Sequence, residues 1–239
     1  MDRLALFKTL QQEINQRPFE RKNINTQAKD GLKYLLYRIK RPLLKLKYQK
    51  FQMQNSQKPW LTPDAIYALE KLLTKEDIGI EYGSGRSTYF FSKLLGQLTS
   101  IEHHKGWYEQ VAKQLRENDC RNVNYHHIPA NRDFTAPSLS SEQQAFMTTK
   151  EYPVKDDVFH TYSTFVTTVP NQSLGFALID GRARVSCALN SISKLKIGGI
   201  MVLDNSERTR YRAVHDALSN WPKLETTTGL TDTTLWIKP

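Results

Sequence analysis

The chain has 239 residues, enough for one well-buried α/β domain with an appendage but short for two ordinary domains. Its formal net charge of +10 lies at the start, because residues 1–60 hold 14 Lys/Arg and 4 Asp/Glu, whereas the remaining chain holds 20 of each sign. A neutral main domain lacks the basic groove that a polynucleotide needs, so we do not expect nucleic acid as a partner.

The sequence has the features of a cytoplasmic protein. No stretch approaches the roughly 18 apolar residues of a membrane span, and the start of the chain lacks the uninterrupted apolar core of a secretion signal. Cys120 and Cys187 stand outside any CxxC or Cys/His spacing and are expected to be free thiols. These observations favour a reducing, intracellular compartment.

Residues 1–58 are predicted to form a basic helical arm. Apolar residues recur at helical spacing over residues 2–16, and a second helix is predicted from about residue 30, with Pro42 expected to kink or end it. Three roles fit such an arm. It docks on the main domain, contacts a second subunit, or lies peripherally on an anionic membrane, where basic amphipathic helices with Leu, Phe and Tyr are stable.

Residues 59–239 are predicted to form the main domain. Thr62 is a good N-cap and Pro63 suits the first helical position, so a helix should lead into the first strand. Strands and helices then alternate, which predicts an α/β fold: a doubly wound, mostly parallel sheet with an antiparallel C-terminal strand. The predicted strands cover residues 77–82, 98–102, 123–128, 175–179 and 200–203. The predicted helices cover residues 63–73, 107–118, 182–196 and 208–219, with a further helix of about three turns between the first two strands and a short one over 158–169. A hairpin follows over 226–239.

A glycine turn follows the first of these strands. Gly83-Ser84-Gly85 has the first two glycines of a dinucleotide-binding GxGxxG turn, but Thr88 stands where the third is expected. A ligand without phosphates needs only the first two, so the turn favours an adenosine-type ligand. Glu102 ends the second strand, where a carboxylate is well placed for the hydroxyls of a ribose.

The runs IGIEYGSGRSTYFF, IEH, LIDGRARV and KIGGIMVLDN resemble the class I S-adenosylmethionine-dependent methyltransferases, and the resemblance covers roughly residues 59–239. It implies a Rossmann-like methyltransferase sheet with S-adenosylmethionine as cofactor. In that family the ExGxG turn holds the methionine portion of the cofactor and the acid after the second strand binds its ribose. The cofactor-binding set implied here is Glu81, Gly83, Ser84, Gly85, Ser87, Glu102 and His103.

A narrower similarity is to the metal-dependent O-methyltransferases of the catechol and caffeoyl-CoA type. It implies that Asp180, Asp204 and Asn205 bind Mg²⁺ or another divalent cation. The alternative is that these residues only shape loops and cap helices. The family's lysine three residues after the first metal ligand is replaced by Ala183. The predicted catalytic residues are Asp180 and the two arginines on either side of Ala183, Arg182 and Arg184. The histidines are further candidate bases: His103, His104, His126, His127 and His160.

The predicted activity is transfer of a methyl group to a hydroxyl. Residues 131–155 are rich in Ser, Thr, Gln and Pro and are predicted to form an irregular substrate lid over the carboxyl ends of the strands. Hydroxyl and amide side chains there suit a polar small molecule or a glycan as the acceptor. The alternative function is a non-catalytic binding or scaffold protein that keeps the fold and uses its N-terminal helices for assembly.

Overall fold

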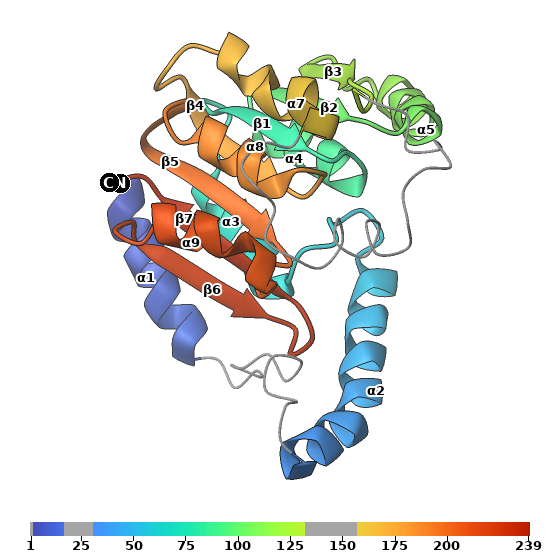
Figure 1. Cartoon of the computed structure of the whole chain (residues 1–239), viewed down its shortest axis with the longest axis vertical. Coiled ribbons are helices and arrows are strands. Elements are labelled where there is room, and N and C mark those ends of the chain that lie inside the picture. The colour runs from blue at the N-terminus through green and yellow to red at the C-terminus, as the bar shows by residue number, and fades with distance from the viewer. Residues whose placement is uncertain (1, 17–30, 132–156) are drawn as a thin grey trace.

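The computed structural model describes residues 2–16, 31–131 and 157–239. Its centre is a sheet of seven strands in the order β3-β2-β1-β4-β5-β7-β6 (Figure 1). Four neighbouring pairs are parallel, and β7 runs antiparallel to both β5 and β6. The predicted mostly parallel sheet with an antiparallel C-terminal strand is therefore confirmed. The strands are β1 Ile78–Tyr82, β2 Gln97–Glu102, β3 Val123–His127, β4 Leu174–Ile179, β5 Leu195–Asp204, β6 Lys223–Thr227 and β7 Asp232–Ile237.

Helices cover both faces of the sheet. Successive residues of a strand point to opposite faces, so Phe176 and Leu178 of β4 lie in one buried cluster while Ala177 and Ile179 lie in the other. The first cluster contains apolar side chains from α1 Arg3–Gln16, α3 Pro63–Leu72 and α4 Arg86–Leu94. The second contains side chains from α7 His160–Thr164, α8 Arg184–Ser191 and α9 Arg212–Ala217. The described elements also include α2 Gly31–Gln54, α5 Lys105–Glu117 and the 3-10 turns η1 Asp157–Phe159, η2 Phe165–Thr168 and η3 Thr209–Tyr211.

The helix predicted over residues 208–219 is the shorter α9 after the turn η3, and the hairpin begins three residues earlier than predicted, with β6. The boundary between α8 and β5 differs most. The helix expected over residues 182–196 is the shorter α8, and β5 begins at Leu195, five residues before the predicted start of its strand. The pair Gly198-Gly199 was expected to separate the two elements but lies inside β5, where the pairing with β4 shifts register. Gly198 has φ of 72°, which glycine adopts readily, so an irregularity in the strand replaces the loop.

The first helix is part of the domain core. Phe7 and Leu10 of α1 are almost fully buried in the cluster on one face of the sheet. Arg3 forms an ion pair of 2.6 Å with Asp77, whose side chain is fully buried, and Lys196 lies 3.2 Å from the other oxygen of the same carboxylate. Burial opposes the charge of Asp77, but the bonds from Arg3 and the backbone of Thr74 hold its pKa below the usual value. Figure 1 shows α1 lying beside β6.

The second helix meets the domain differently. Pro42 lies inside α2 and does not end it. The C-terminal part is attached to the domain, because the Tyr48 hydroxyl donates to the carbonyl of Leu61 (3.3 Å) and Gln52 donates to the carbonyl of Pro59 (3.4 Å). The rest of α2 reaches away from the sheet (Figure 1). No described helix combines the length and apolar character needed to cross a membrane. The domain boundary at residue 58 stays a prediction.

The predicted substrate lid over residues 131–155 lies outside the described residues, apart from Asn131. Asn131 is held by its backbone N–H, which donates to the carbonyl of Val158, and by its side chain, which bonds with Thr161.

Candidate functional site

The glycine turn after β1 is pressed against the loop that follows β4. Gly83 has φ of 90°, and a Cβ atom there would lie 2.7 Å from the backbone of Gly181. Gly181 in turn leaves no room for a side chain, because a Cβ atom would lie 2.0 Å from the hydroxyl of Tyr162. Two backbone segments therefore meet at the carboxyl edge of the sheet, where open parallel sheets bind ligands. Glycine is needed on both sides of this contact.

Thr88 explains why the third glycine is missing from the turn. Its hydroxyl accepts a hydrogen bond from the backbone N–H of Gly85 (3.0 Å) and donates one to Glu81 (2.7 Å). Ser100 donates a second hydrogen bond, of 2.6 Å, to the same oxygen of Glu81. The side chain of Thr88 thus links the turn to the strand that precedes it. Sequence analysis had noted only that this position lacked a glycine.

Glu81 is fully buried, and its carboxyl group is incompletely hydrogen-bonded. Burial raises the pKa of Glu81 to about 7, against the opposing effect of hydrogen bonds from Ser100, Ser87 and Thr88. Its other carboxyl oxygen, Oε1, has no hydrogen-bond partner among the described residues. Ser87 is buried beside this carboxyl group. A ligand with a cationic group at the glycine turn would favour the ionised form of Glu81.

Glu102 is the opposite case, a carboxylate surrounded by donors. One oxygen accepts hydrogen bonds from the backbone N–H groups of His103 and His104, both at 2.8 Å, and the other accepts from the backbone N–H and hydroxyl of Ser84 at 3.2 and 3.1 Å. The Ser84 hydroxyl also bonds with the hydroxyl of Tyr125 at 2.6 Å. Burial opposes ionisation, but His103 and the backbone donors lower the pKa of Glu102 to about 2. This carboxylate stays ionised and fixed beside the turn.

Aromatic rings border Glu102. The ring of His103 packs edge-on against Phe159 and Tyr162, with centroids 5.5 and 6.2 Å apart. On the turn itself, the indole N–H of Trp107 donates to the carbonyl of Ser84 at 2.8 Å. Trp107 is 45% exposed, so its ring is available to a flat ligand. Sequence analysis gave Trp107 no role in the site. His104 has a structural one, since its ring accepts a hydrogen bond from the backbone of Trp107 and caps α5.

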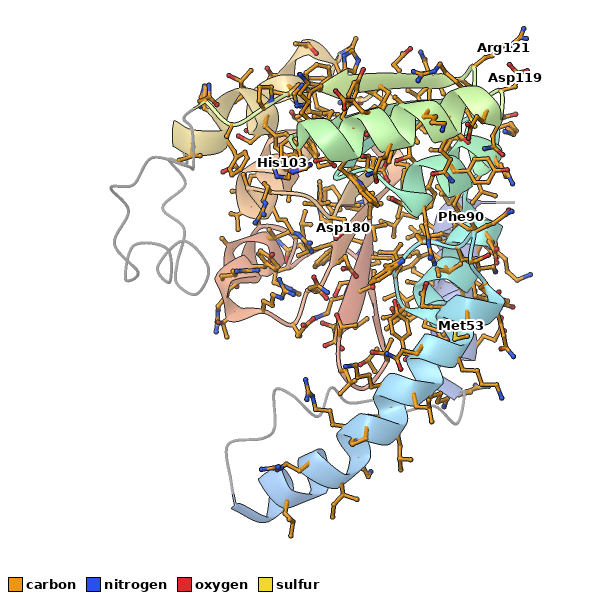
Figure 2. The ribbon with its side chains drawn as sticks, turned by 90° about the vertical axis from the view of Figure 1, so that its right-hand side faces the viewer. Met53, Phe90, His103, Asp119, Arg121 and Asp180 are labelled. Atoms are coloured by element: carbon orange, nitrogen blue, oxygen red, sulfur yellow. The ribbon has the colours of Figure 1, made fainter. Side chains whose placement is uncertain are left out.

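Arg184 occupies the centre of the predicted metal site. Its guanidinium donates to Asp180 Oδ1 at 2.8 Å and to the main-chain carbonyl of Asp180 at 2.7 Å. The other terminal nitrogen donates to the carbonyl of Asp204 and lies 3.5 Å from the amide oxygen of Asn205. All three predicted metal ligands are thus brought together, and a guanidinium contacts each of them. Figure 2 labels Asp180 near the middle of the molecule.

The two aspartates interact with each other as well as with Arg184. Their carboxyl groups share a hydrogen bond. Burial raises the pKa of both groups. The pKa of Asp204 rises to about 8, with the charge of Asp180 as the second cause after burial. The positive charge of Arg184 opposes these shifts without removing them. The pair therefore binds a proton more readily than an isolated aspartate does. Thr233 donates a hydrogen bond of 3.0 Å to the remaining oxygen of Asp204.

These residues do not fit a divalent cation. A guanidinium already contacts Asp180, Asp204 and Asn205, and a second cation among the same oxygens would be repelled by it. Within residues 2–16, 31–131 and 157–239 no group of three or more His, Cys, Asp and Glu side chains is arranged to hold a metal. Arg182, the other predicted arginine, is exposed.

Tyr48 is a second residue that sequence analysis did not assign to the site. It comes from α2, and its pKa is raised by burial and then by the negative charges of Asp204 and Asp180. On the same helix, Gln52 accepts a hydrogen bond of 3.4 Å from Arg86, which begins α4 directly after the glycine turn. The guanidinium of Arg86 also lies over the ring of Trp60, 5.7 Å from its centroid. One side of α2 therefore borders both halves of the site.

Comparison with known proteins bears on the fold. No family model matches the sequence, and no curated protein matches it significantly. Among solved structures, a methyltransferase-like protein from Silicibacter pomeroyi DSS-3 is 21% identical, with a TM-score of 0.54 over 76% of this chain and 89% of that one. A putative methyltransferase from Streptococcus mutans, in complex with SAH, is 12% identical with a TM-score of 0.49 over 72% and 93% of the two chains. The TrmI tRNA (m1A58) methyltransferase from Aquifex aeolicus is 15% identical with a TM-score of 0.48 over 74% and 68%.

At these identities the likeness concerns the fold alone, and we base the fold assignment on the Silicibacter protein. Together with the strand order, it confirms the Rossmann-like methyltransferase fold that the sequence predicted.

Proposed function

We propose that this protein is an S-adenosylmethionine-dependent methyltransferase that acts on a hydroxyl group of a polar small molecule or glycan. One observation carries the proposal. At the same edge of the sheet, the ionised Glu102 and the glycine turn lie beside a carboxyl pair, Asp180 and Asp204, whose pKa values are raised by burial. The first half suits the ribose and methionine of the cofactor, and the second suits an acceptor that must lose a proton. The fold of the Silicibacter protein supports the same assignment.

Glu102, the glycine turn and Glu81 offer groups that suit the different parts of the cofactor. Glu102 presents two fixed oxygens, and Ser84 Oγ is a side-chain donor on one of them that a ribose hydroxyl would replace. Gly83 and Gly85 add no side chains on either side of Ser84, so a ligand can lie against the backbone of the turn. Glu81 lies beneath, with an oxygen that has no hydrogen-bond partner within the described part of the chain, and its charge would complement the cationic end of a methionine moiety. S-adenosylmethionine, when bound, supplies a methyl group on a positively charged sulfur.

The acceptor half performs the proton transfer. As the bond from the methyl carbon to the acceptor oxygen forms, the carbon–sulfur bond breaks, and the hydroxyl proton must leave. The ionised member of the pair Asp180 and Asp204 takes that proton at a carboxylate oxygen. Through its two terminal nitrogens, Arg184 holds the carboxyl group of Asp180 and the main-chain carbonyl of Asp204, and its charge limits the build-up of negative charge on the pair. Arginine stays protonated at neutral pH, so we assign it positioning and not proton transfer.

Two measurements test the proposal. Isothermal titration calorimetry with S-adenosylmethionine and its demethylated product should show binding, and absence of binding at millimolar ligand would overturn the assignment. Transfer of labelled methyl groups should then be measured over a panel of polyols, phenols, glycans and RNA, with and without chelator. Transfer to a hydroxyl acceptor that is indifferent to the chelator is the expected result. Transfer only to RNA bases would replace the acceptor class, and cofactor binding without any transfer would favour the scaffold function.

A further inference from the structure

The helix α2 is unusual in composition. Its sequence, GLKYLLYRIKRPLLKLKYQKFQMQ, contains seven Lys or Arg residues and no Asp or Glu. Such a helix cannot neutralise itself through pairs three or four residues apart. Any group that balances its charge must therefore lie outside the helix.

One side of α2 is apolar and exposed. Ile39, Leu43 and Leu46 are 60%, 66% and 64% exposed, and Met53 is 81% exposed. Leu35, at 55%, extends the same row toward the start of the helix. The spacings of four, three and seven residues place these side chains on one face. In Figure 2, α2 reaches away from the sheet, with Met53 labelled on its domain-proximal part.

The opposite side of α2 faces the domain. Leu44, Tyr48 and Phe51 are partly buried, and Phe51 packs against the core cluster. At about 100° per residue, these three side chains lie roughly half a turn from the exposed apolar row. The apolar row is therefore not a core face left uncovered by chance, because the helix has a separate face for the core.

Cations line both edges of the apolar row. Lys40 and Lys47 fall on one edge and Arg38 and Lys45 on the other, when residues are placed at about 100° intervals. All four side chains are exposed. An aliphatic row bordered by basic residues on both edges is the arrangement of helices that lie in the plane of a membrane interface.

We propose that the outer face of α2, formed by Leu35, Ile39, Leu43, Leu46 and Met53 with its flanking basic residues, docks the protein on an anionic membrane surface. The apolar side chains enter the boundary between headgroups and acyl chains, and the basic side chains contact lipid phosphates. Nucleic acid fits this face less well, since Leu, Ile and Met offer bases neither stacking nor hydrogen bonds. A second copy of the chain fits less well too, since it would bring two wholly cationic helices together.

Docking would place the proposed site near the lipid surface. The inner face of the same helix carries Tyr48, which feels the charges of Asp204 and Asp180, and Gln52, which bonds with Arg86 after the glycine turn. An acceptor carried on a lipid would then reach the site from the surface, a consequence that rests on the proposed function. Membrane binding itself needs neither cofactor nor methyl transfer, so the two proposals fail separately.

Flotation of the full chain with vesicles tests this inference. We expect binding to vesicles of phosphatidylcholine mixed with phosphatidylglycerol, weaker binding to phosphatidylcholine alone, and loss of binding as salt rises. The double variant Leu43→Gln/Leu46→Gln should bind about tenfold more weakly or less, because the buried apolar area is lost. Arg38→Gln/Lys45→Gln should lose the preference for anionic lipid. The matched control is Ile197→Gln, at a 74% exposed apolar residue of β5, which should float like the parent.

Three results would overturn the inference. The first is failure of the intact protein to float with anionic vesicles. The second is flotation that the Leu43→Gln/Leu46→Gln variant retains in full. The third is the absence of flotation together with binding to another partner. RNA binding in a gel-shift assay would assign the face to RNA, and a dimer in sedimentation that the leucine variant dissociates would assign it to a second copy of the chain.

Discussion

Two acidic centres at the same edge of the sheet differ in how their charge is held. Glu102 accepts hydrogen bonds from three backbone N–H groups and a hydroxyl, and its pKa is lowered to about 2. Asp204 is buried beside Asp180, and its pKa is raised to about 8 although Arg184 is in contact with the pair. Both residues are nearly inaccessible to solvent, with 4% exposure each. Burial alone therefore does not decide the charge state; the supply of donors and the neighbouring carboxyl group do.

The two acidic centres therefore suit different steps of the proposed function. A carboxylate that is ionised at every physiological pH suits permanent binding of hydroxyl groups. A carboxyl pair that titrates near neutrality suits the uptake of a proton during reaction. A substitution at one centre should remove its function and leave the other centre in place.

The largest effect is expected from Asp180→Asn. The amide cannot take a proton, so methyl transfer should fall by about 10² to 10⁴, the usual contribution of a general base. Cofactor affinity measured by calorimetry should stay within about twofold, because the glycine turn and Glu102 are untouched. Asp216→Asn, at an exposed aspartate of α9, is the matched control. Equal loss of binding and turnover would contradict the division between the two centres.

The next largest effect is expected from Glu102→Gln. The amide group turns donors toward the backbone N–H groups of His103 and His104, and the charged acceptor is lost. Affinity for S-adenosylhomocysteine should fall by about ten- to a hundredfold, since hydrogen bonds to charged groups contribute about 1.5–3 kcal/mol. Glu117→Gln, at an exposed residue of α5, should bind like the parent. Unchanged affinity in Glu102→Gln would refute the ribose assignment.

A smaller effect is expected at Thr88, whose side chain links the glycine turn to β1. Thr88→Val removes the hydroxyl that joins Gly85 to Glu81 while keeping the shape of the side chain. It should lower the free energy of unfolding by about 1–3 kcal/mol, the cost of leaving buried polar groups unsatisfied. Thr88→Ser keeps the hydroxyl and should lie much closer to the parent in urea unfolding. Equal losses for the two variants would assign the effect to packing.

The smallest effect is a change in how the melting temperature depends on pH. Because the folded-state pKa values of Asp204 and Glu81 are raised to about 8 and 7, the folded state binds more protons, and stability should fall as pH rises from about 4 through 8. Glu102 acts in the opposite sense. Its stabilisation is present above about 4.5 and is lost as pH falls toward 2.

Scanning calorimetry over this range separates the two centres. Asp204→Asn should weaken the decline toward about pH 8, which then depends on Glu81, and should leave the acid limb unchanged. Glu102→Gln should change the acid limb alone. A flat profile in the parent protein above pH 5 would show that the aspartate pair does not hold its proton.

The sequence predicted the sheet and the position of its polar edge well. Buried strands ending in Glu81, Glu102, Asp180 and Asp204 were recognisable because short apolar runs stop at acidic residues, and parallel strands bring those ends together. The start of β5 was missed because Gly198 and Gly199 are usual loop residues, and only the pairing with β4 shows that they form an irregularity within a strand.

The contacts at the site were harder to predict than the fold. The sequence placed Arg184 near Asp180, but its rotamer, which fills the predicted metal site, depends on contacts with Asp204 and Asn205. Tyr48 comes from a helix more than a hundred residues away from these aspartates, so no local pattern links them. Thr88 did leave a signal, because a hydroxyl seven residues after a buried acid, and three after a glycine, can bond to both.

The position of α1 has a consequence for the order in which the protein folds. Its apolar face shares a buried cluster with Leu224, Leu235 and Ile237, and Gln11 donates to the carbonyl of Lys223. During synthesis the first helix is made early, but a large part of its cover emerges from the ribosome only with the last two strands. Until then the face around Phe7 stays open to chaperones, and completion of the core must wait for β6 and β7.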